Sequence, residues 1–298
     1  MSTQRTILLI TGCSHGSLCS ALALQFHKAG WRVFASARTM SKLTRVKDAG
    51  IEAVLLDTLS DESIQNCVVQ IRDMTGGSLD ALLNNAGGGY SMPLMDVDVV
   101  KARELFDLNV WSILSVTRAF LPLLMKSTHE CGALVVNKTA CASVTAGTTP
   151  FSGAYNASKA AAASLTETLR LELEPFGIKV VNLMTGAVRS TFHDNAPAPI
   201  LPSTSLYNVA RETVEKAMSG ANSADGSDPE EWASQVVADL SKRSPPHWIW
   251  QGRFWTTVRL ASHLPVGALD GSMKKMVGLC VVEREYTKQH GSVEEVSR

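Results

Sequence analysis

The sequence predicts an α/β fold of the Rossmann type, in which a doubly wound parallel sheet lies between two layers of helices. Short apolar runs alternate with amphipathic stretches of helical length along residues 6–185, and polar or glycine-containing turns follow several of the runs. Such alternation is typical of β–α–β units, whose strands are buried on both faces of the sheet. We therefore expect a three-layer αβα arrangement in a single domain.

Seven strands are predicted from short apolar runs that end at turn residues. They cover residues 6–10, 31–35, 53–56, 79–83, 133–137, 178–183 and 247–250. Helices are predicted from apolar residues at helical spacing and from the glycine and proline residues that end them. They cover residues 21–26, 61–74, 97–126, 154–173 and 229–241. Because proline removes a backbone donor, Pro122 should kink or restart the longest of these helices.

Two segments near the C-terminus differ from this pattern. Residues 186–245, which we call the lid, are rich in turn-forming residues and should cover a substrate, so that residues 1–252 form one domain. Residues 253–298 form a C-terminal extension that we expect to pack on the domain. The extension is apolar but carries charged residues such as Lys274 and Lys275, which a spanning helix would place in hydrocarbon. An interfacial helix in peripheral contact with a membrane is the alternative.

The composition argues against several classes of protein. The formal net charge is zero, unlike that of a nucleic-acid binder with a basic face. Neither a secretory signal nor an apolar run of about 18 residues occurs. The cysteines form no Cys-x-x-Cys pair or zinc-ligand cluster, so we expect reduced, buried thiols, no metal site and a cytoplasmic location. These cysteines are Cys13, Cys19, Cys67, Cys131, Cys141 and Cys280.

A glycine turn between the first strand and the first helix is a candidate dinucleotide-binding loop. A strand, a turn and a helix in this order place backbone N–H groups against a pyrophosphate. A third glycine, expected at Leu18 or Cys19, is missing, and an ordinary turn without a ligand is the alternative. The candidate contacts are Thr11, Gly12, Ser14, His15 and Gly16.

The second strand ends at Ser36-Ala37-Arg38, where a carboxylate would bind the two ribose hydroxyls of NAD. No carboxylate is present, and the guanidinium of Arg38 matches the geometry of a 2′-phosphate. The sequence therefore predicts NADP(H) as the cofactor, with a solvated surface arginine as the alternative.

Tyr155 and Lys159 lie four positions apart in a predicted helix and therefore on one of its faces. A free tyrosine has a pKa near ~10, and a neighbouring ammonium should lower it. The pair is a candidate proton donor for a carbonyl oxygen. A surface helix is the alternative, but the dinucleotide loop upstream favours the catalytic interpretation.

These motifs, in this order, resemble the short-chain dehydrogenase/reductase family over nearly the whole chain. Thr11-Gly12-Cys13-Ser14, Pro150-Phe151, Thr185-Gly186 and Leu201-Pro202 resemble more narrowly the fungal and yeast branch that includes the acyl-dihydroxyacetone-phosphate reductases. The resemblance implies that Lys159 binds the nicotinamide ribose and that Asn109 helps to position a relay water and this lysine. It also implies that Asp57 contacts adenine. Further cofactor contacts implied by the resemblance are Asn85, Ala86, Gly87, Tyr155 and Thr191.

Family members carry a carbonyl-binding serine about thirteen residues before the tyrosine, and here that position falls on Ala142. Ser143 best matches the Ser-Val pattern of the family, and Thr139 is the rival. A short insertion within residues 137–147 leaves a third alternative, in which no hydroxyl is in place.

The resemblance implies NADPH-dependent reduction of a ketone or aldehyde to an alcohol, with Tyr155 as proton donor and Ser143 polarising the carbonyl. Apolar lid residues such as Leu201 and Leu206 favour a small hydrophobic substrate, either a specialised fungal metabolite or an acyl-dihydroxyacetone-phosphate. The rivals are a scaffold recruited to a non-redox cyclisation or rearrangement, and a cofactor-binding sensor. The family also implies a homodimer or homotetramer. Peripheral contact of the C-terminal extension with the endoplasmic reticulum or lipid droplets is the alternative to a purely cytoplasmic location.

Overall fold

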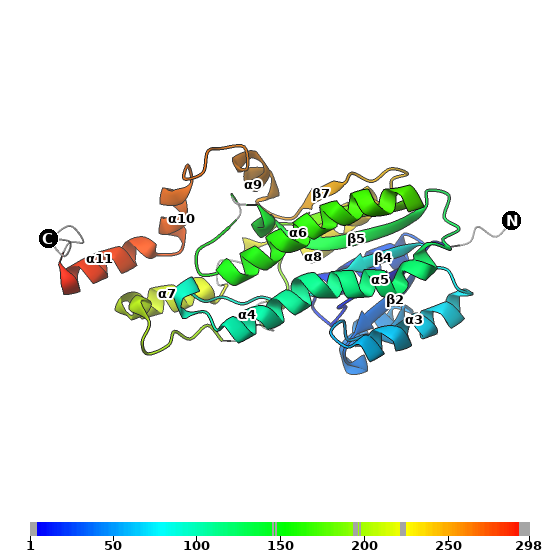
Figure 1. The fold of residues 1–298 in the computed structure, drawn as a ribbon, viewed down its shortest axis with the longest axis horizontal. Helices are drawn as coiled ribbons and strands as arrows, with labels where there is room; N and C mark the ends of the chain where they lie inside the picture. The colour runs from blue at the N-terminus through cyan, green and yellow to red at the C-terminus, as the bar shows by residue number, and fades with distance from the viewer. Residues whose placement is uncertain are drawn as a thin grey trace.

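The computed structural model describes residues 5–144, 146, 148–192, 196, 198–220 and 225–291. Within these residues, seven parallel strands form one sheet in the order β3-β2-β1-β4-β5-β6-β7 (Figure 1). The strands are β1 (Ile7–Ile10), β2 (Arg32–Ala37), β3 (Glu52–Leu55), β4 (Ala81–Asn84), β5 (Ala133–Ala140), β6 (Ile178–Thr185) and β7 (Trp248–Gln251). The predicted doubly wound parallel sheet is confirmed.

Helices cover both faces of the sheet. On one face, α1 (Leu18–Lys28) and α8 (Pro229–Leu240) enclose a core that contains Phe26 and the fully buried Trp232. On the other face, α3 (Asp61–Thr75), α5 (Ser112–Leu124) and α6 (Gly153–Leu173) enclose a second core. The two cores follow from the alternation of side chains along each strand, because successive residues point to opposite faces of the sheet.

Several element boundaries follow directly from local sequence signals. The side chain of Ser17 accepts a hydrogen bond from the backbone N–H of Ser20 at the start of α1, and Asp228 caps α8 in the same way. The short helix α2 (Thr44–Asp48) was not predicted. Strands β5 and β6 also continue further than predicted, to Ala140 and Thr185.

No new helix begins at Pro122, so the expected restart there is not observed. Residues 97–126 contain α4 (Val99–Phe106), a π-helical turn at Asp107–Trp111 and then α5, which runs through Pro122 in its last turns. The irregular turn instead surrounds Asn109, whose side chain is buried and bonded to other segments. Single π-turns of this kind are frequent at functional sites.

Buried amide side chains lie side by side on three neighbouring strands, in the carboxyl-terminal half of each strand. Asn84 on β4, Asn137 on β5 and Asn182 on β6 lie at the same register. Asn84 Nδ2 donates to Asn137 Oδ1 at 2.8 Å, and Asn137 Nδ2 donates to Thr166 Oγ1 on α6 at 3.1 Å. Polar bonds inside an apolar core fix register, so this set holds α6 at one position on the sheet.

The lid and the C-terminal extension contact each other. The lid contains a helix that was not predicted, α7 (Arg211–Met218), and the extension contains α9 (Trp255–Ala261), α10 (Asp270–Met276) and α11 (Leu279–His290). Val277 between α10 and α11 is buried with Val214 of α7 and Phe151. Figure 1 shows α10 and α11 beside α7 at the end of the molecule where α4 also lies. Within the described ranges, no helix is long and apolar enough to cross a membrane.

Candidate active site

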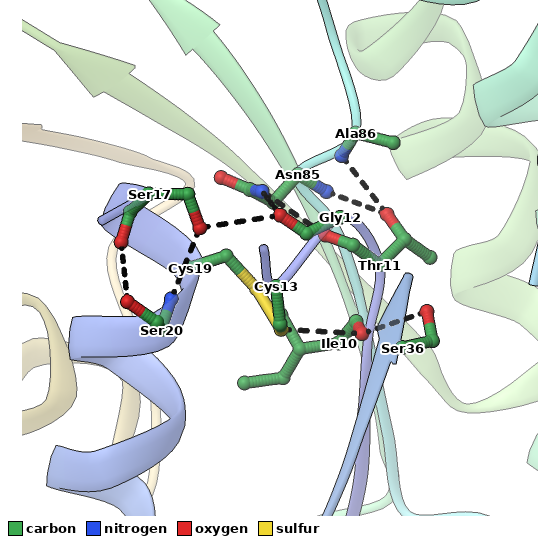
Figure 2. Close-up of a disulfide and its surroundings, with 10 residues drawn as sticks. All are labelled: Ile10, Thr11, Gly12, Cys13, Ser17, Cys19, Ser20, Ser36, Asn85 and Ala86. Carbon is green, nitrogen blue, oxygen red and sulfur yellow. Dashed lines mark hydrogen bonds between the residues drawn. A yellow bond between two sulfur atoms is a disulfide. The ribbon is translucent and has the colours of Figure 1, made fainter. Parts of the chain in front are cut away.

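The predicted dinucleotide loop follows β1 and lies against the turn that follows β4. Thr11 Oγ1 accepts hydrogen bonds from the backbone N–H groups of Asn85 and Ala86, both at 3.0 Å (Figure 2). Gly12 and Gly16 both have a positive φ. A side-chain carbon at Gly12 would lie 2.9 Å from the Ala86 Cα atom, so this close approach requires glycine.

A disulfide joins Cys13 in this loop to Cys19 in the first turn of α1 (Figure 2). The expectation of reduced thiols is therefore wrong for this pair, because α1 begins at Leu18 and brings Cys19 back onto the loop. Among the remaining cysteines, Cys67 and Cys141 are buried, whereas Cys280 is exposed and Cys131 partly so. Burial raises the pKa of the Cys67 thiol to about 12.

The other predicted cofactor contacts surround this loop. The backbone N–H of His15 donates to the Lys42 carbonyl at 2.8 Å, and the Ser14 carbonyl accepts from the backbone N–H of Ser17. The backbone N–H of Thr191, from the segment after β6, donates to the Gly16 carbonyl at 3.3 Å. These contacts place the segment after β6 against the glycine loop.

Arg38 and Asp57 lie just beyond the ends of β2 and β3, at the same edge of the sheet. Arg38 is exposed, and no described residue makes an ion pair or hydrogen bond with its guanidinium. The carboxylate of Asp57 accepts a hydrogen bond from the backbone N–H of Leu59 at 3.0 Å.

Asn109 links the turn after β4 to helix α6. Its Oδ1 accepts from the backbone N–H of Gly88 at 2.9 Å, and its Nδ2 donates to the Gly88 carbonyl at 3.0 Å. The same Nδ2 donates to Ser158 Oγ at 2.9 Å, and that hydroxyl donates to the Tyr155 carbonyl at 2.7 Å. The side chain of Asn109 therefore fixes the turn of α6 that carries both Tyr155 and Lys159.

Lys159 is 3 % exposed, and its ammonium donates to the Lys138 carbonyl at 3.3 Å. A side-chain carbon at Gly87 would lie 3.4 Å from Lys159 Nζ, so the glycine lets the turn after β4 approach the ammonium. Burial and, as the smaller cause, the charge of Lys138 together lower the pKa of Lys159 to about 7.

Tyr155 lies with its ring centroid 6.0 Å from Lys159 Nζ. Burial raises the pKa of this phenol above its ordinary value, and the neighbouring Cys141 thiol adds to the rise. The expected lowering by the lysine is therefore wrong for this arrangement, because the loss of hydration is the larger effect.

The hydroxyl groups before Tyr155 differ in what they bind. Thr139 is buried, and its hydroxyl donates to Asn182 Oδ1 on the neighbouring strand, β6. Ser143 lies in the turn after β5, where its Oγ accepts from the backbone N–H of Ala140 at 3.3 Å. The Ser143 hydroxyl proton is therefore not used in that bond, whereas the Thr139 hydroxyl is held inside the sheet.

Comparison with known proteins assigns the family. The model of the short chain dehydrogenase family matches residues 6–199. This chain belongs to that family. It is 45% identical over 289 residues to a short-chain dehydrogenase/reductase of Pestalotiopsis microspora, covering 96% of this chain and 98% of the relative. It is 32% identical over 294 residues to the NADPH-dependent 1-acyldihydroxyacetone phosphate reductase of Schizosaccharomyces pombe, covering 94% and 97%.

A solved short-chain dehydrogenase of Streptomyces avermitilis superposes with a TM-score of 0.74 at 26% identity, covering 94% of this chain and 98% of the other. The resemblance found in the sequence is confirmed at the level of the family. As a member of it, this short-chain dehydrogenase is an oxidoreductase.

The site fits the nicotinamide cofactor that the family uses. Asn85 Oδ1 and Thr185 Oγ1 are buried and lack hydrogen-bond partners among the described residues. They lie at the carboxyl ends of β4 and β6, where a doubly wound sheet binds its ligands. Because a buried polar atom without a partner is costly, these two atoms favour a polar ligand in this position.

Sequence reasoning missed two residues of this short-chain dehydrogenase that lie beside the pair on α6. Cys141 contributes to the raised pKa of Tyr155, and Lys138 to the lowered pKa of Lys159. Lys138 could have been noticed in the sequence, because it is a lysine within the apolar strand run that begins at Ala133. No group of three or more potential metal ligands occurs among the residues that the structure describes.

Proposed function

We propose that this short-chain dehydrogenase is an NADPH-dependent carbonyl reductase, which converts a ketone or aldehyde of a hydrophobic substrate to an alcohol. The observation that carries the proposal is the Tyr155 phenol, on the helix turn that also holds Lys159. Because its pKa is raised, the phenol keeps its proton at neutral pH. A protonated phenol is the form that can donate to an alkoxide oxygen.

The choice of NADP(H) rests on Arg38. Its exposed guanidinium has no partner among the described residues and no carboxylate lies beside it in the sequence, so it would bind a 2′-phosphate. The fission yeast relative is named as NADPH-dependent, which supports the same choice. When bound, the cofactor supplies the hydride for the carbonyl carbon.

Tyr155, Lys159 and Asn109 then each have one role. Tyr155 donates the proton, and Lys159 binds the nicotinamide ribose through its buried ammonium. Asn109 acts through Ser158 and positions the backbone between these two residues. Fixed positions matter because small misplacements of a proton donor reduce the rate strongly.

We propose Ser143 as the donor to the substrate carbonyl, in preference to Thr139. The hydroxyl of Thr139 is already bonded to Asn182 Oδ1, and turning it toward a substrate would leave a buried amide oxygen without its partner. Ser143 accepts a bond from the Ala140 N–H, which leaves its own proton free to donate.

A hydrophobic substrate is favoured by the surroundings of Tyr155. The ring of Phe192 lies 5.7 Å from the Tyr155 ring, and Tyr90 and Met92 pack in the same cluster. The apolar side chains would exclude water around the carbonyl. A specialised fungal metabolite fits this surrounding, and the acyl chain of an acyl-dihydroxyacetone-phosphate is the alternative.

Titration with NADPH and NADH tests the cofactor assignment, and consumption of NADPH tests the reaction. Wild type should bind NADPH more tightly, and Arg38→Asp should lose about tenfold to hundredfold in NADPH affinity while NADH binding changes less. With a panel of hydrophobic ketones, loss of reduced-nicotinamide absorbance should equal alcohol formed. Equal wild-type affinities would contradict the choice of cofactor, and product formed without any loss of NADPH would contradict the redox reaction.

A further inference from the structure

Lys138 lies on the face of the sheet that carries the glycine loop. Side chains alternate along β5, and the preceding residue, Asn137, points to α6, where it bonds Thr166. Lys138 therefore points to the opposite face, as Val136 does two residues earlier. The core on that face also contains Cys13 of the glycine loop. Lys138 follows Val136 toward the carboxyl end of the strand, where the site lies.

The ammonium of Lys138 has no negative partner. In the described part of the chain, no hydrogen bond or ion pair involves its side chain, although the residue is partly buried. A second cation, Lys159, donates to the backbone carbonyl of Lys138, and the charge of Lys138 contributes to the lowered pKa of Lys159. Burial lowers the pKa of Lys138 to about 8, so the charged form still predominates at pH 7. A partly desolvated ammonium without a negative partner favours an anionic ligand.

The glycine loop supplies little charge of its own. Residues 11–17 contain no lysine or arginine, and His15 is the one basic side chain among them. A pyrophosphate in this loop would meet backbone N–H groups and the N-terminus of the 11-residue helix α1. Strand β5 is two positions from β1 in the sheet, a separation of roughly 10 Å. An extended lysine side chain and a diphosphate group can together span this separation.

We propose that the Lys138 ammonium binds the diphosphate of the dinucleotide, as the cationic partner that the glycine loop lacks. This inference rests on the proposed function, because it assumes that the site binds a nicotinamide dinucleotide. Lys138 differs in this role from Arg38, which lies beyond β2 and would select the 2′-phosphate. The two residues should therefore respond to different parts of the same ligand.

Calorimetric titration with fragments of the cofactor tests the proposal. ADP-ribose contains the diphosphate without the nicotinamide or the 2′-phosphate, whereas adenosine 2′-phosphate contains the 2′-phosphate without any 5′-phosphate. Lys138→Met should weaken the binding of ADP-ribose, NADH and NADPH by one common factor of about tenfold to hundredfold. The same change should leave the affinity for adenosine 2′-phosphate unaltered, and Lys138→Arg should retain most of the wild-type affinity for ADP-ribose.

Lys179→Met is the matched control for the loss of one charge. Lys179 lies at the amino end of β6, where its Nζ donates to the Arg243 carbonyl at 2.8 Å, so its replacement should change no affinity. If wild type and Lys138→Met bind ADP-ribose equally, this inference is wrong while the proposed function stands. A loss for adenosine 2′-phosphate as large as that for ADP-ribose would also overturn it, as would a change confined to the KM of an acidic substrate. If wild type binds no dinucleotide at all, both proposals fail.

Discussion

At the scale of single residues, burial sets the protonation of the candidate site. Tyr155 keeps its proton because the phenolate would be poorly hydrated, and Lys159 loses part of its charge for the same reason. Proximity of an ammonium and a phenol is therefore insufficient to lower the pKa of the phenol. Opposite shifts in an acid and a base that share one cause are typical of a desolvated active site.

Tyr155→Phe removes only the phenol oxygen and keeps the ring that packs against Phe192. We expect turnover to fall by about 10²–10⁴-fold, because a positioned acid contributes this much to a proton transfer. Dissociation constants for NADPH should stay close to wild type, since Lys159 and the glycine loop are unchanged. Steady-state kinetics and equilibrium titration check the two halves of the prediction. Normal turnover in the variant would show that another group donates the proton.

Lys159→Met should change the pH dependence of stability. The folded protein releases the Lys159 proton near pH 7, whereas an unfolded lysine keeps it to about pH 10.4. The unfolded state thus binds more protons between pH 7 and 9, and the free energy of unfolding of the wild type should rise with pH there. In the variant, the slope of the free energy of unfolding against pH should be smaller by up to roughly 1.4 kcal/mol per pH unit. Urea denaturation at pH 7, 8 and 9 without cofactor measures it, and identical slopes would contradict the shifted pKa.

At the scale of elements, local signals set where most helices begin and end, and long-range contacts set the exceptions. Ser17 and Asp228 cap α1 and α8 through side-chain hydrogen bonds to backbone N–H groups of the first turn. The π-helical turn at Asp107–Trp111 has no local signal. It is associated with the bonds of Asn109 to Gly88 and Ser158, which lie 21 and 49 residues away in the sequence.

The disulfide at the start of α1 should contribute to the stability of the protein. Cys13 and Cys19 are separated by six positions, and closing so short a loop stabilises a protein by about 2 kcal/mol in the chain-entropy description. Cys19→Ser should lower the free energy of unfolding by this amount without reductant and by little in dithiothreitol. Denaturation with and without reductant checks it. Six free thiols in the unreduced, denatured wild type would contradict the pairing.

At the scale of the whole molecule, one apolar cluster connects the lid to the C-terminal extension. Val277 is 6 % exposed between α10 and α11, and it packs with Val214 of the lid and with Phe151, just before α6. The extension is thus attached next to α6, the helix that carries Tyr155 and Lys159. Movements of the lid and of the extension should therefore be coupled.

Val277→Asp should detach the extension from the lid. A carboxylate in an apolar contact loses hydration without gaining a partner, which costs several times more than the loss of one methyl group. We expect trypsin to cleave within residues 253–291 sooner, while the thermal melting of the sheet changes little. Val266→Asp is the control, because Val266 is 91 % exposed and its replacement should alter neither measurement. Equal cleavage rates for the two variants would contradict the predicted role of this contact.

The sequence by itself determined the order of the seven strands along the chain, the glycine loop after β1 and the placement of Tyr155 and Lys159 on one helix face. These features depend on periodicity and spacing over a few residues, which the chain encodes locally. Arg38 and Asp57 could be assigned to the sheet edge for the same reason, since strand ends are local features.

Only the tertiary structure decided which groups meet. The Thr139 hydroxyl is held by Asn182, 43 residues away, which distinguishes it from Ser143. Lys138 adjoins Lys159 only because β5 passes beneath α6, and the raised pKa of Tyr155 appears only once its surroundings exclude water. Burial and long-range pairing depend on how distant segments pack, so no pattern confined to a few neighbouring residues encodes them.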